Sequence, residues 1–478
     1  MATESQPPLC VDLDGTLVRS DTLMETLIAL ARSRPLYLAL CPFWLLRGRA
    51  YFKRTIAALV TLDVAHLPYS AALLDLLARE RAAGRTLVLV TAADQRTAQP
   101  IADHLGLFHE VLASDGVSNL KGRNKRAVLT RRFGVRGYDY AGNSRADLAV
   151  WEHAHGALVV NASGGIARRV AAPVRQLLRD GRGGPRVLLR AIRVHQWLKN
   201  ALIFIPLVTS HQLGNPRRLA PALLAFLAFS FCASAVYLIN DLLDLEADRR
   251  HATKRTRPLA AGDLSLQAGL ALVPILLAAS FAVAALLPLP FALVLGTYAV
   301  ATTAYSFWLK HVALADVVTL ACLYTMRVIA GFTATGVEFS AWLLAFSLFF
   351  FLNLAFVKRY SELYGLLRSG DSTRKARGYF PSDLELVANL GSSSGYISVL
   401  VFAFYTNSDR VAPLYSMPLL LWLICPLQLY WIGRVWLIAH RGEMHDDPVI
   451  FALTDRVSYV VGAAAGAVLL LASVVRVG

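Results

Sequence analysis

The chain has 478 residues, enough for at least two domains, and 56% of them are hydrophobic. Its mean hydropathy of +0.49 is high for a wholly soluble protein and low for one embedded in a membrane throughout. The apolar residues concentrate after about residue 197, so we expect a soluble part followed by a membrane part. A net charge of +16 is compatible with nucleic-acid binding, but the arginines gather beside apolar runs, which favours attraction to anionic lipid instead.

The five cysteines are scattered, and none belongs to a CxxC pair. This pattern excludes a disulfide framework and a cysteine zinc site. The first residues are polar and lead into a strand-like run, so we expect no signal peptide and a cytoplasmic first domain.

Residues 1–162 alternate short apolar runs with helical stretches. Four runs are predicted as buried strands: Leu9–Val11, Thr86–Val90, Tyr138–Ala141 and Ala157–Val160. This alternation predicts an α/β domain with a doubly wound parallel sheet. Such sheets bind ligands at the carboxyl ends of their strands.

Polar residues follow these predicted strand ends. Asp12, Asp14 and Gly15 come directly after the first strand, and Thr91 follows the second. Gly142-Asn143-Ser144 follows the third, with Asp147 nearby, and Lys125 opens the helix before that strand. In this order, the set resembles the haloacid dehalogenase superfamily of phosphotransferases.

The resemblance implies roles for these residues. Asp12 would be the nucleophile that takes a phosphoryl group, and Asp14 the general acid/base. Thr91 and Lys125 would bind the phosphoryl oxygens, with Lys121 as a rival for the lysine role. Mg²⁺ would be held by Asp12, Asp14 and Asp147. Asn143 departs from the family, which often has aspartate there, so one negative charge near the metal is missing.

Between the first two strands, residues 22–83 are predicted to be helical and unusually apolar, above all at Leu36–Leu46. In the resembling superfamily an insertion here is a small cap that chooses the substrate. The apolar stretch either packs on the core of the cap or suits a substrate with a lipid tail, because large exposed patches mark interaction sites.

Residues 163–196 are predicted to form a basic linker. Glycines punctuate this stretch, and between residues 163 and 193 eight arginines stand against the single acid Asp180. A polybasic segment beside a membrane helix favours contact with the inner leaflet.

Residues 197–478 are predicted to form an all-α membrane domain of nine spans. The apolar runs cover about 197–213, 219–240, 267–287, 289–307, 313–333, 340–357, 393–406, 416–433 and 457–475. The seventh run is short and has room to start earlier, and Pro288-Leu289-Pro290 is the only break between the third and fourth. With the N-terminus inside, fifteen Lys and Arg residues fall in cytoplasmic loops and four outside. We therefore expect a multi-pass protein of the inner membrane with its sites on the cytoplasmic side.

The segment Ile239–Leu259 carries the densest chemistry. On a helix, Asn240, Asp241, Asp244 and Asp248 fall within an arc of about 100°, whereas Glu246 lies on the other side. Carboxylates on one face suit Mg²⁺, which reaches proteins through a few carboxylates and substrate phosphates. The basic residues that follow would attract a diphosphate: Arg249, Arg250, Lys254, Arg255 and Arg257.

Further polar clusters stand at the cytoplasmic ends of the predicted spans. They contain the candidate substrate-binding residues Lys199, Asn200, Tyr305, Lys310, Lys358, Arg359, Tyr360, Glu362 and Asp455. Each alone is typical of a solvated helix end. Together they indicate a cavity that opens on one side of the membrane.

The segment NDLLDLEAD followed by KRTRPLAAG resembles the first aspartate-rich motif of UbiA-type intramembrane prenyltransferases. In that superfamily a second aspartate-rich motif follows the sixth span, where this chain has KRYSEL with only Glu362. The set RVHQWLKN, NDLLDLEAD, YSFWLK, KRYSEL and DPVIFALTDR resembles the decaprenyl-phosphate phosphoribosyltransferases more closely.

That resemblance implies a polyprenyl phosphate acceptor, a phosphoribosyl diphosphate donor and pyrophosphate as the leaving group. Mg²⁺ on Asp241, Asp244 and Asp248 would neutralise the departing diphosphate. The soluble domain would then remove the 5-phosphate of the product. The alternatives are an aromatic-acid prenyltransferase with an unrelated or regulatory phosphatase, and a non-enzymatic lipid carrier. The sequence predicts a lipid bilayer and no nucleic acid as partners, and it leaves open homo-oligomer formation, chain length and pathway.

Overall fold

The computed structural model describes residues 6–162, 164–181, 183–368, 377–408, 415–444, 447–452 and 454–474. The chain divides into two compact units. The first unit contains residues 1–193 and 237–274, and the second contains residues 194–236 and 275–478. Of the predicted basic linker, Ser163 and Arg182 lie outside the described residues, as does Leu453 of the motif DPVIFALTDR.

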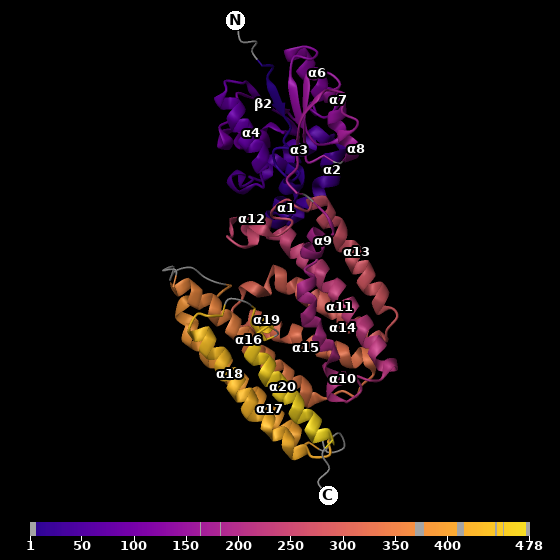
Figure 1. Cartoon of the computed structure of the whole chain (residues 1–478), viewed down its shortest axis with the longest axis vertical. Helices are drawn as coiled ribbons and strands as arrows, with labels where there is room; N and C mark the ends of the chain where they lie inside the picture. The colour runs from indigo at the N-terminus through magenta and orange to yellow at the C-terminus, as the bar shows by residue number, and fades with distance from the viewer. Residues whose placement is uncertain are drawn as a thin grey trace. The chain divides into compact units, whose positions relative to one another are not determined.

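The first unit is built on a six-stranded parallel sheet in the order β3-β2-β1-β4-β5-β6 (Figure 1). The strands are β1 Leu9–Val11, β2 Leu87–Asp94, β3 Glu110–Ser114, β4 Asp139–Gly142, β5 Gly156–Val160 and β6 Val174–Leu178. All four predicted strands and the doubly wound parallel sheet are confirmed.

Alternating side chains of the sheet enter two separate hydrophobic cores. Leu9 and Val11 of β1 pack with helices α4 (Ala71–Ala82) and α5 (Gln95–Leu105). Cys10 packs on the opposite face, against α6 (Arg123–Phe133) and α7 (Leu148–Trp151). Both faces of the sheet are therefore covered, which explains why its central strands are continuous apolar runs.

Two strands of the sheet were not predicted, β3 and β6. Strand β3 is only partly buried over most of its length, and β6 lies at the sheet edge with most of its side chains exposed. Because neither is a buried apolar run, the hydrophobic pattern does not mark them. Strand β6 comes from the segment that we expected to act as a linker.

The segment between β1 and β2 forms helices, as predicted. These are α1 (Thr22–Ser33), the 3₁₀ helix η1 (Pro35–Leu40), α2 (Cys41–Leu46), α3 (Arg49–Leu59), η2 (Val64–His66) and α4. The stretch from Pro35 to Leu46 contains no buried residue, and Leu36 and Leu46 are 86% and 85% exposed. We call Pro35–Leu46 the apolar cap segment below.

Eight helices of the described chain are long and apolar enough to cross a membrane. They comprise α11 (Pro216–Leu243), α13 (Leu266–Ala284), α14 (Leu289–Phe307), α15 (Ala315–Thr335), α16 (Ala341–Arg368), α17 (Leu384–Thr406, preceded by η7 Pro381–Asp383), α18 (Ile424–His440, preceded by η8 Pro418–Leu423) and α20 (Arg456–Val474). The seventh predicted span does start earlier, and Pro288 caps α14.

The first predicted span differs from the expectation. Residues 197–213 contain most of the 3₁₀ helix η4 (Val194–Phe204) and the short helix α10 (Ile205–Thr209) instead of one long α-helix. Pro206 stands at the start of α10, where its missing N–H interrupts the hydrogen-bond pattern of a continuous helix.

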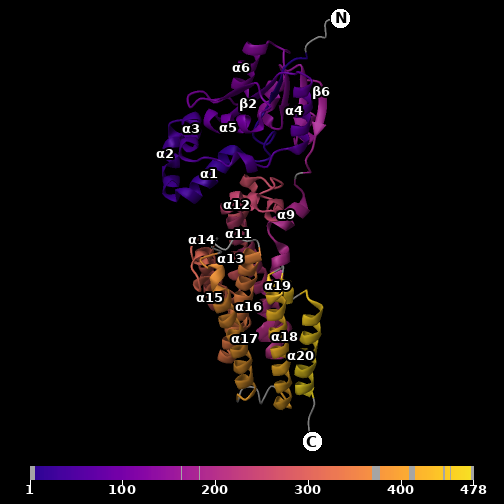
Figure 2. The same ribbon diagram turned by 90° about the vertical axis from the view of Figure 1, so that its left-hand side faces the viewer.

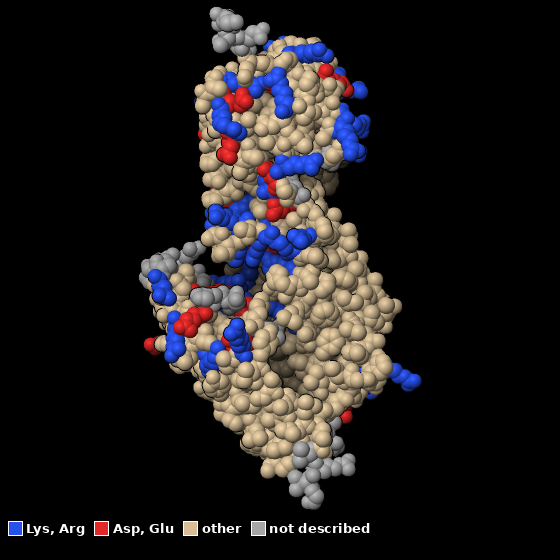
Figure 3. All heavy atoms as spheres, in the orientation of Figure 1, with Lys and Arg blue, Asp and Glu red and all other residues tan. Residues whose placement is uncertain are grey.

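Helix α15 contributes to two hydrophobic cores of the second unit. Figure 2 shows α16, α17, α18 and α20 of this unit running side by side. One face of α15 joins α16, α17 and α18 in a core that contains Val317 and Tyr324. Another joins α11 and α14 in a core that contains Phe229, Phe291 and Leu323. On the face shown in Figure 3, the surface of the long apolar helices is almost free of charged side chains, as expected for a surface that contacts lipid.

The end of α11 and the segment that follows it belong to the first unit. This segment contains α12 (Leu245–Arg250), the 3₁₀ helix η5 (Lys254–Thr256) and the first turns of α13. The aspartate-rich motif, expected in the membrane domain, is therefore described together with the α/β domain.

One prediction concerns a buried ion pair in the α/β domain. Asp139 of β4 is fully buried, and Arg85 donates a hydrogen bond to it. We expect Arg85→Leu to destabilise the domain by about 3 kcal/mol, because it removes the main partner of a buried carboxylate. Arg132→Leu removes the exposed Arg132–Glu110 pair and should cost less than about 1 kcal/mol. Pulse proteolysis of the detergent-solubilised chain in urea measures both, and equal losses would contradict this account.

Candidate active sites

Asp12 lies at the carboxyl end of β1 in a buried network of charged groups. Lys125 of α6 donates hydrogen bonds to Asp12 Oδ1 at 2.6 Å and to the Tyr140 hydroxyl at 2.8 Å. The Tyr140 hydroxyl donates in turn to Asp147 Oδ1 at 2.7 Å. Of the two candidate lysines, Lys125 is thus the one that contacts Asp12.

Asp12 is buried close to two other carboxylates. Burial raises the pKa of Asp12 to about 7, and the nearby carboxylates of Asp147 and Asp14 act in the same direction against Lys125. A hard divalent cation would relieve this repulsion.

Asp14 has the surroundings of a general acid. The backbone N–H and the hydroxyl of Thr22 both donate to its Oδ1 at 2.7 Å. Burial and the neighbouring Asp21 carboxylate raise the pKa of Asp14. A carboxyl group that keeps its proton closer to neutral pH is better able to protonate a leaving oxygen.

Asp147 holds the loop after β4. Its Oδ2 accepts hydrogen bonds from the Ser144 N–H at 2.9 Å and the Ser144 hydroxyl at 2.7 Å. The side chain of Asn143, in contrast, lies against Gly15, where an added Cβ would come within 2.1 Å of the Asn143 amide nitrogen. The sequence predicted Asp147 as a metal ligand. In the structure, Asp147 is bonded within the loop after β4, whereas the side chain of Asn143 contacts the Asp12–Asp14 loop at Gly15.

The donor set at this site fits Mg²⁺. Among the described residues no three His, Cys, Asp or Glu side chains form a metal cluster. However, Asp12, Asp14 and the Asn143 amide provide hard oxygen donors, and the carboxylates close to Asp12 favour a cation.

Thr91 lies in the last part of β2 and is fully buried. Its hydroxyl accepts a hydrogen bond from the Ala93 N–H at 2.9 Å. Thr91 is not among the residues that line the cavity described next, so in this structure it shapes the end of the strand.

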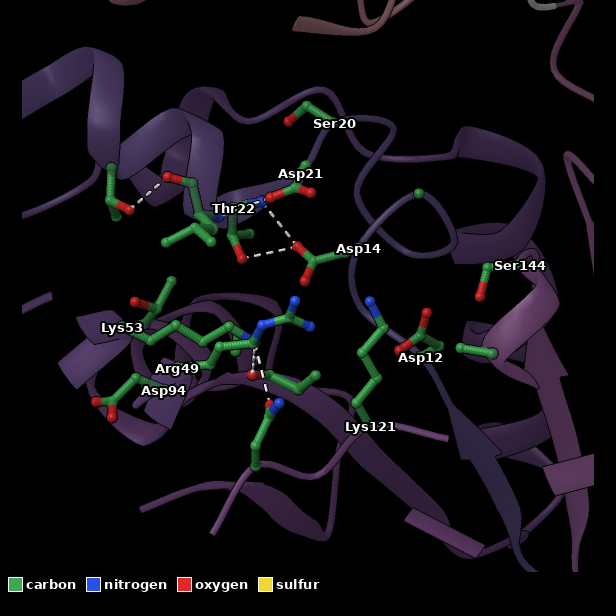
Figure 4. Close-up of a pocket in the computed structure, with 18 of the residues that line it drawn as sticks. Asp12, Asp14, Ser20, Asp21, Thr22, Arg49, Lys53, Asp94, Lys121 and Ser144 are labelled. Carbon is green, nitrogen blue, oxygen red and sulfur yellow. Dashed lines mark hydrogen bonds between the residues drawn. The ribbon is translucent and has the colours of Figure 1, made fainter. Parts of the chain in front are cut away.

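A cavity of about 510 Å³ opens beside Asp12 and Asp14 (Figure 4). Residues of the cap and of the loops after the strands line most of it. Ser265 and Gln267, at the start of α13, also line it, and the Gln267 amide donates to Asp21 Oδ2 at 2.9 Å. The wall of this cavity therefore includes residues that follow the aspartate-rich motif.

Asp241 and Asp248 of the aspartate-rich motif share one guanidinium. Arg257 donates to Asp241 Oδ1 at 3.0 Å and to Asp248 Oδ2 at 2.6 Å, and Arg193 also donates to Asp241. Both carboxylates are buried. Their hard oxygens are a donor set that fits Mg²⁺.

The motif crosses a helix boundary. Helix α11 ends at Leu243, and Asp244 occupies the N-cap position of α12. Helical spacing persists, because the Asp244 N–H donates to the Asn240 carbonyl and the Asp248 N–H to the Asp244 carbonyl, both at 2.8 Å. Glu246 contacts a different set of side chains, Arg250 and Arg32.

Basic residues after the motif bind the cap. Arg249 makes a two-pronged ion pair with Glu25 of α1, with N–O distances of 2.6 and 3.0 Å, and both side chains are nearly buried. Arg250 pairs with Asp63 at 2.7 Å. Of the predicted basic residues, Arg257 contacts the aspartates, Lys254 lies in η5, and Arg255 is exposed.

In the second unit, two lysines meet one carboxylate. Lys199 and Lys358 donate to Asp447 Oδ2 at 3.0 and 2.9 Å. Burial alone would raise the pKa of Asp447, but the ammonium groups of Lys358 and Lys199 hold this pKa well below its usual range. Two cations on one anion leave positive charge that suits a phosphate.

Other predicted binding residues have structural partners instead. Arg359 is fully buried between Asp316 and Glu362, and Tyr360 contacts His440 at 3.0 Å. The Asp455 carboxylate accepts hydrogen bonds from the two terminal guanidinium nitrogens of Arg434, at 2.8 and 3.0 Å. It also accepts one from the Ser458 N–H and so caps the start of α20. The ion pairs of the buried Arg359 and of the partly buried Asp455 favour roles in holding helices together. Glu362 is likewise engaged by Arg359.

Tyr305 and Lys310 stand at the end of α14. The Tyr305 hydroxyl accepts a hydrogen bond from Arg377 at 3.0 Å, and Lys310 lies in the 3₁₀ helix η6 (Leu309–His311). Arg377 also approaches Glu362 at 3.9 Å. These contacts bring the ends of α14 and α16 to one polar region of the second unit.

The sequence analysis missed Arg327 in α15. It donates to Asn200 Oδ1 at 2.8 Å and to the Tyr298 hydroxyl at 2.9 Å, deep among the helices. A signal was present, since an arginine within a predicted span is functional or paired by default. Asp316, Asp447 and Arg193 were likewise not selected as site residues.

Comparison with known proteins identifies both parts of the chain. The UbiA prenyltransferase family matches residues 203–457, and haloacid dehalogenase-like hydrolases match residues 9–152. The chain belongs to the UbiA prenyltransferase family and carries a haloacid dehalogenase-like domain at its N-terminus. Both predicted memberships are confirmed.

Individual relatives refine this picture. Uncharacterized protein y4nM of Sinorhizobium fredii is 41% identical over 95% of this chain and 89% of its own. Nodulation protein NoeC of Azorhizobium caulinodans is 35% identical over 59% of this chain and 92% of its own. Decaprenyl-phosphate phosphoribosyltransferase of Corynebacterium glutamicum is 35% identical over 45% of this chain and 67% of its own. The predicted similarity to phosphoribosyltransferases is confirmed.

A prediction follows from the contact between Gly15 and Asn143. Gly15 has φ +75°, and a Cβ there would overlap the Asn143 side chain. We expect Gly15→Ala to abolish hydrolysis of p-nitrophenyl phosphate, since it displaces the loop that carries Asp12 and Asp14. Gly106→Ala is the matched control, with φ +61° and no atom within 4 Å of the added Cβ. It should cost about 1 kcal/mol of stability and retain hydrolysis. Equal loss in both would assign the effect to backbone strain alone.

Proposed function

We propose that this chain transfers 5-phosphoribose from phosphoribosyl diphosphate to a polyprenyl phosphate, and that its N-terminal domain then removes the 5-phosphate. The observation that carries the first step is the similarity to decaprenyl-phosphate phosphoribosyltransferases, joined to the paired carboxylates and arginines of the aspartate-rich motif. KRYSEL, with a single carboxylate already engaged by Arg359, favours this donor over a prenyl diphosphate.

In the transfer step, an oxygen of the lipid phosphate forms a bond to C1 of the ribose, and pyrophosphate leaves with the electrons of the broken bond. Bound Mg²⁺ would supply positive charge for the diphosphate, held by Asp241, Asp244 and Asp248. Arg193 and Arg257, which neutralise these carboxylates in this structure, are placed to turn toward the diphosphate when a metal takes over that task.

Lys199 and Lys358 would bind a second phosphate group of the substrates, because both ammoniums face the single carboxylate of Asp447. The excess of Lys and Arg in one set of loops supports a site on the cytoplasmic side of the membrane.

In the second step, Asp12 attacks the 5-phosphate and forms an aspartyl phosphate, while Asp14 gives its proton to the leaving ribose oxygen. Lys125 binds the phosphoryl oxygens, and water then releases inorganic phosphate. The observation that joins the two steps is the lining of this cavity by Ser265 and Gln267, which follow the aspartate-rich motif.

The decisive test supplies purified protein with Mg²⁺, labelled phosphoribosyl diphosphate and polyprenyl phosphate. Labelled lipid is the expected product. Prenylation of an aromatic acid without labelled lipid would replace this proposal with ordinary UbiA chemistry, and no product from either substrate pair would favour a carrier.

Variants of the aspartate-rich motif test the transferase site. Asp241→Asn or Asp244→Asn should lower the transfer rate by at least about 100-fold, because the diphosphate charge loses a metal ligand. Glu246→Gln should be nearly silent, since its partners are Arg250 and Arg32. The rate of labelled-lipid formation measures all three. Comparable losses at Glu246 and Asp244 would show that the site lies elsewhere on the motif.

A nucleophile variant tests the coupling of the steps. In Asp12→Asn protein, the 5-phosphorylated lipid should accumulate, whereas wild type should convert it to the dephosphorylated form. Mass spectrometry of the extracted lipid distinguishes the two. If both proteins leave the same phosphorylated lipid, the domains do not act in sequence.

A further inference from the structure

The cavity beside Asp12 contains basic side chains that the transfer of one phosphoryl group does not require. Arg49 and Lys53 lie one turn apart on α3, and Lys121 stands on the loop before α6. In Figure 4, Arg49 and Lys53 run side by side into the cavity, and Lys121 enters it near Asp12 and Asp14. Lys125 already serves the nucleophile, so these three cations form a separate group.

Carboxylates also line this cavity, but the hydrogen bonds of Lys53 go to neutral acceptors. The Lys53 ammonium donates to the Ala92 carbonyl at 2.6 Å and to Asn119 Oδ1 at 3.3 Å. Within the described part of the chain, Arg49 and Lys121 form no side-chain ion pair. Cations positioned in a cavity without carboxylate partners are suited to an anionic group of a ligand.

Buried polar atoms in the same cavity also point to a ligand. Ser20 Oγ and Asp94 Oδ2 have no hydrogen-bond partner among the described residues, and both side chains are at least nine-tenths buried. An unpaired buried polar group is costly, and few persist without a function. The Ser20 hydroxyl and the Asp94 carboxylate oxygen can each accept a hydrogen bond from a hydroxyl group of a sugar.

The mouth of the cavity is apolar on the cap side. Leu45 is half-exposed, Phe52 is nearly buried, and both line the cavity. Leu45 belongs to the apolar cap segment, which continues outward as an exposed hydrophobic surface. A ligand with a polar head and an apolar tail would match this gradient.

We propose that Arg49, Lys53 and Lys121 form a second phosphate subsite, which binds the phosphodiester of a lipid-linked sugar phosphate while its monoester faces Asp12. This inference rests on the proposed function and narrows its substrate to a molecule with two phosphate groups and a lipid. Ser20 and Asp94, which also line the cavity, bind hydroxyl groups of the ligand. Leu45 contacts the first carbons of the lipid.

The same anionic chemistry could come from a soluble sugar bisphosphate, so the test uses three substrates. These are ribose 5-phosphate, ribose 1,5-bisphosphate, and a short-chain polyprenyl-phosphoryl ribose 5-phosphate. The full-length protein in detergent with Mg²⁺ is given each in turn, and release of inorganic phosphate is followed. The variants are Arg49→Gln and Lys121→Gln. Arg47→Gln is the control, because Arg47 lies two residues from Arg49 on the cap, packs on Tyr51 and does not line the cavity.

For Arg49→Gln and Lys121→Gln, kcat/KM for the lipid-linked substrate should fall at least about 10-fold more than kcat/KM for ribose 5-phosphate, through a rise in KM. Arg47→Gln should leave this ratio as in wild type. Hydrolysis of ribose 5-phosphate also reports that each variant is folded. Equal losses on both substrates would overturn the subsite, since the cations would then serve the transferred phosphoryl group.

Wild-type protein that prefers ribose 1,5-bisphosphate to the lipid-linked substrate would overturn the lipid part of the inference. Wild-type protein that releases no phosphate from the lipid-linked substrate would contradict the proposed function itself. Failure of the subsite and failure of the function are therefore separate outcomes.

Discussion

Negative charge removed from water must be balanced nearby, and the organisation of this chain follows from how each buried carboxylate meets that requirement. Among the described residues, several buried or largely buried carboxylates have a basic partner within their own unit, whereas the buried Asp94 has no ion pair among them. The pairs are Asp12 with Lys125, Asp139 with Arg85, Asp241 with Arg193 and Arg257, Asp316 with Arg359, and Asp447 with Lys199 and Lys358. Where the balance is closed and fully buried, as at Asp316, the pair holds helices together. Where it is incomplete, the residues are suited to a ligand.

The two proposed sites differ in the direction of that imbalance. At the proposed site around Asp12, the carboxylates of Asp12, Asp14 and Asp147 lie near the buried ammonium of Lys125, an arrangement suited to a metal cation. Around Asp447, ammonium groups outnumber the carboxylate, so the site is prepared for the phosphate itself. The aspartate-rich motif lies between these cases, since Asp241 and Asp248 are neutralised by guanidiniums that are themselves good phosphate ligands.

Much of the α/β domain could be predicted from the sequence because its information is local. A buried central strand is a continuous apolar run, and Asp12 or Lys125 is found from its distance to such a run. Strand β6 and the lining residues Ser265 and Gln267 depend on which distant segments meet, so no local pattern marks them. Arg327 had a local signal, a charge within a span, but its partner Asn200 stands 127 positions away. For Arg359 the sequence gives no sign of its buried position, because a basic residue at a helix end looks accessible until its partner Asp316 is placed.

The ion pair between Arg249 and Glu25 makes part of the α/β domain depend on a segment far along the chain. Arg249, the residue next to Asp248, binds Glu25 of the cap, and 224 positions separate the two. An isolated N-terminal fragment ending before the first apolar helix would keep its whole sheet and Asp12, yet lose Ser265 and Gln267 from the wall of the cavity and leave Glu25 without Arg249. The compact unit that contains the sheet is thus discontinuous in sequence, since residues 237–274 complete it. A cut in the chain after the sheet would therefore also require new partners for Glu25 and Asp21.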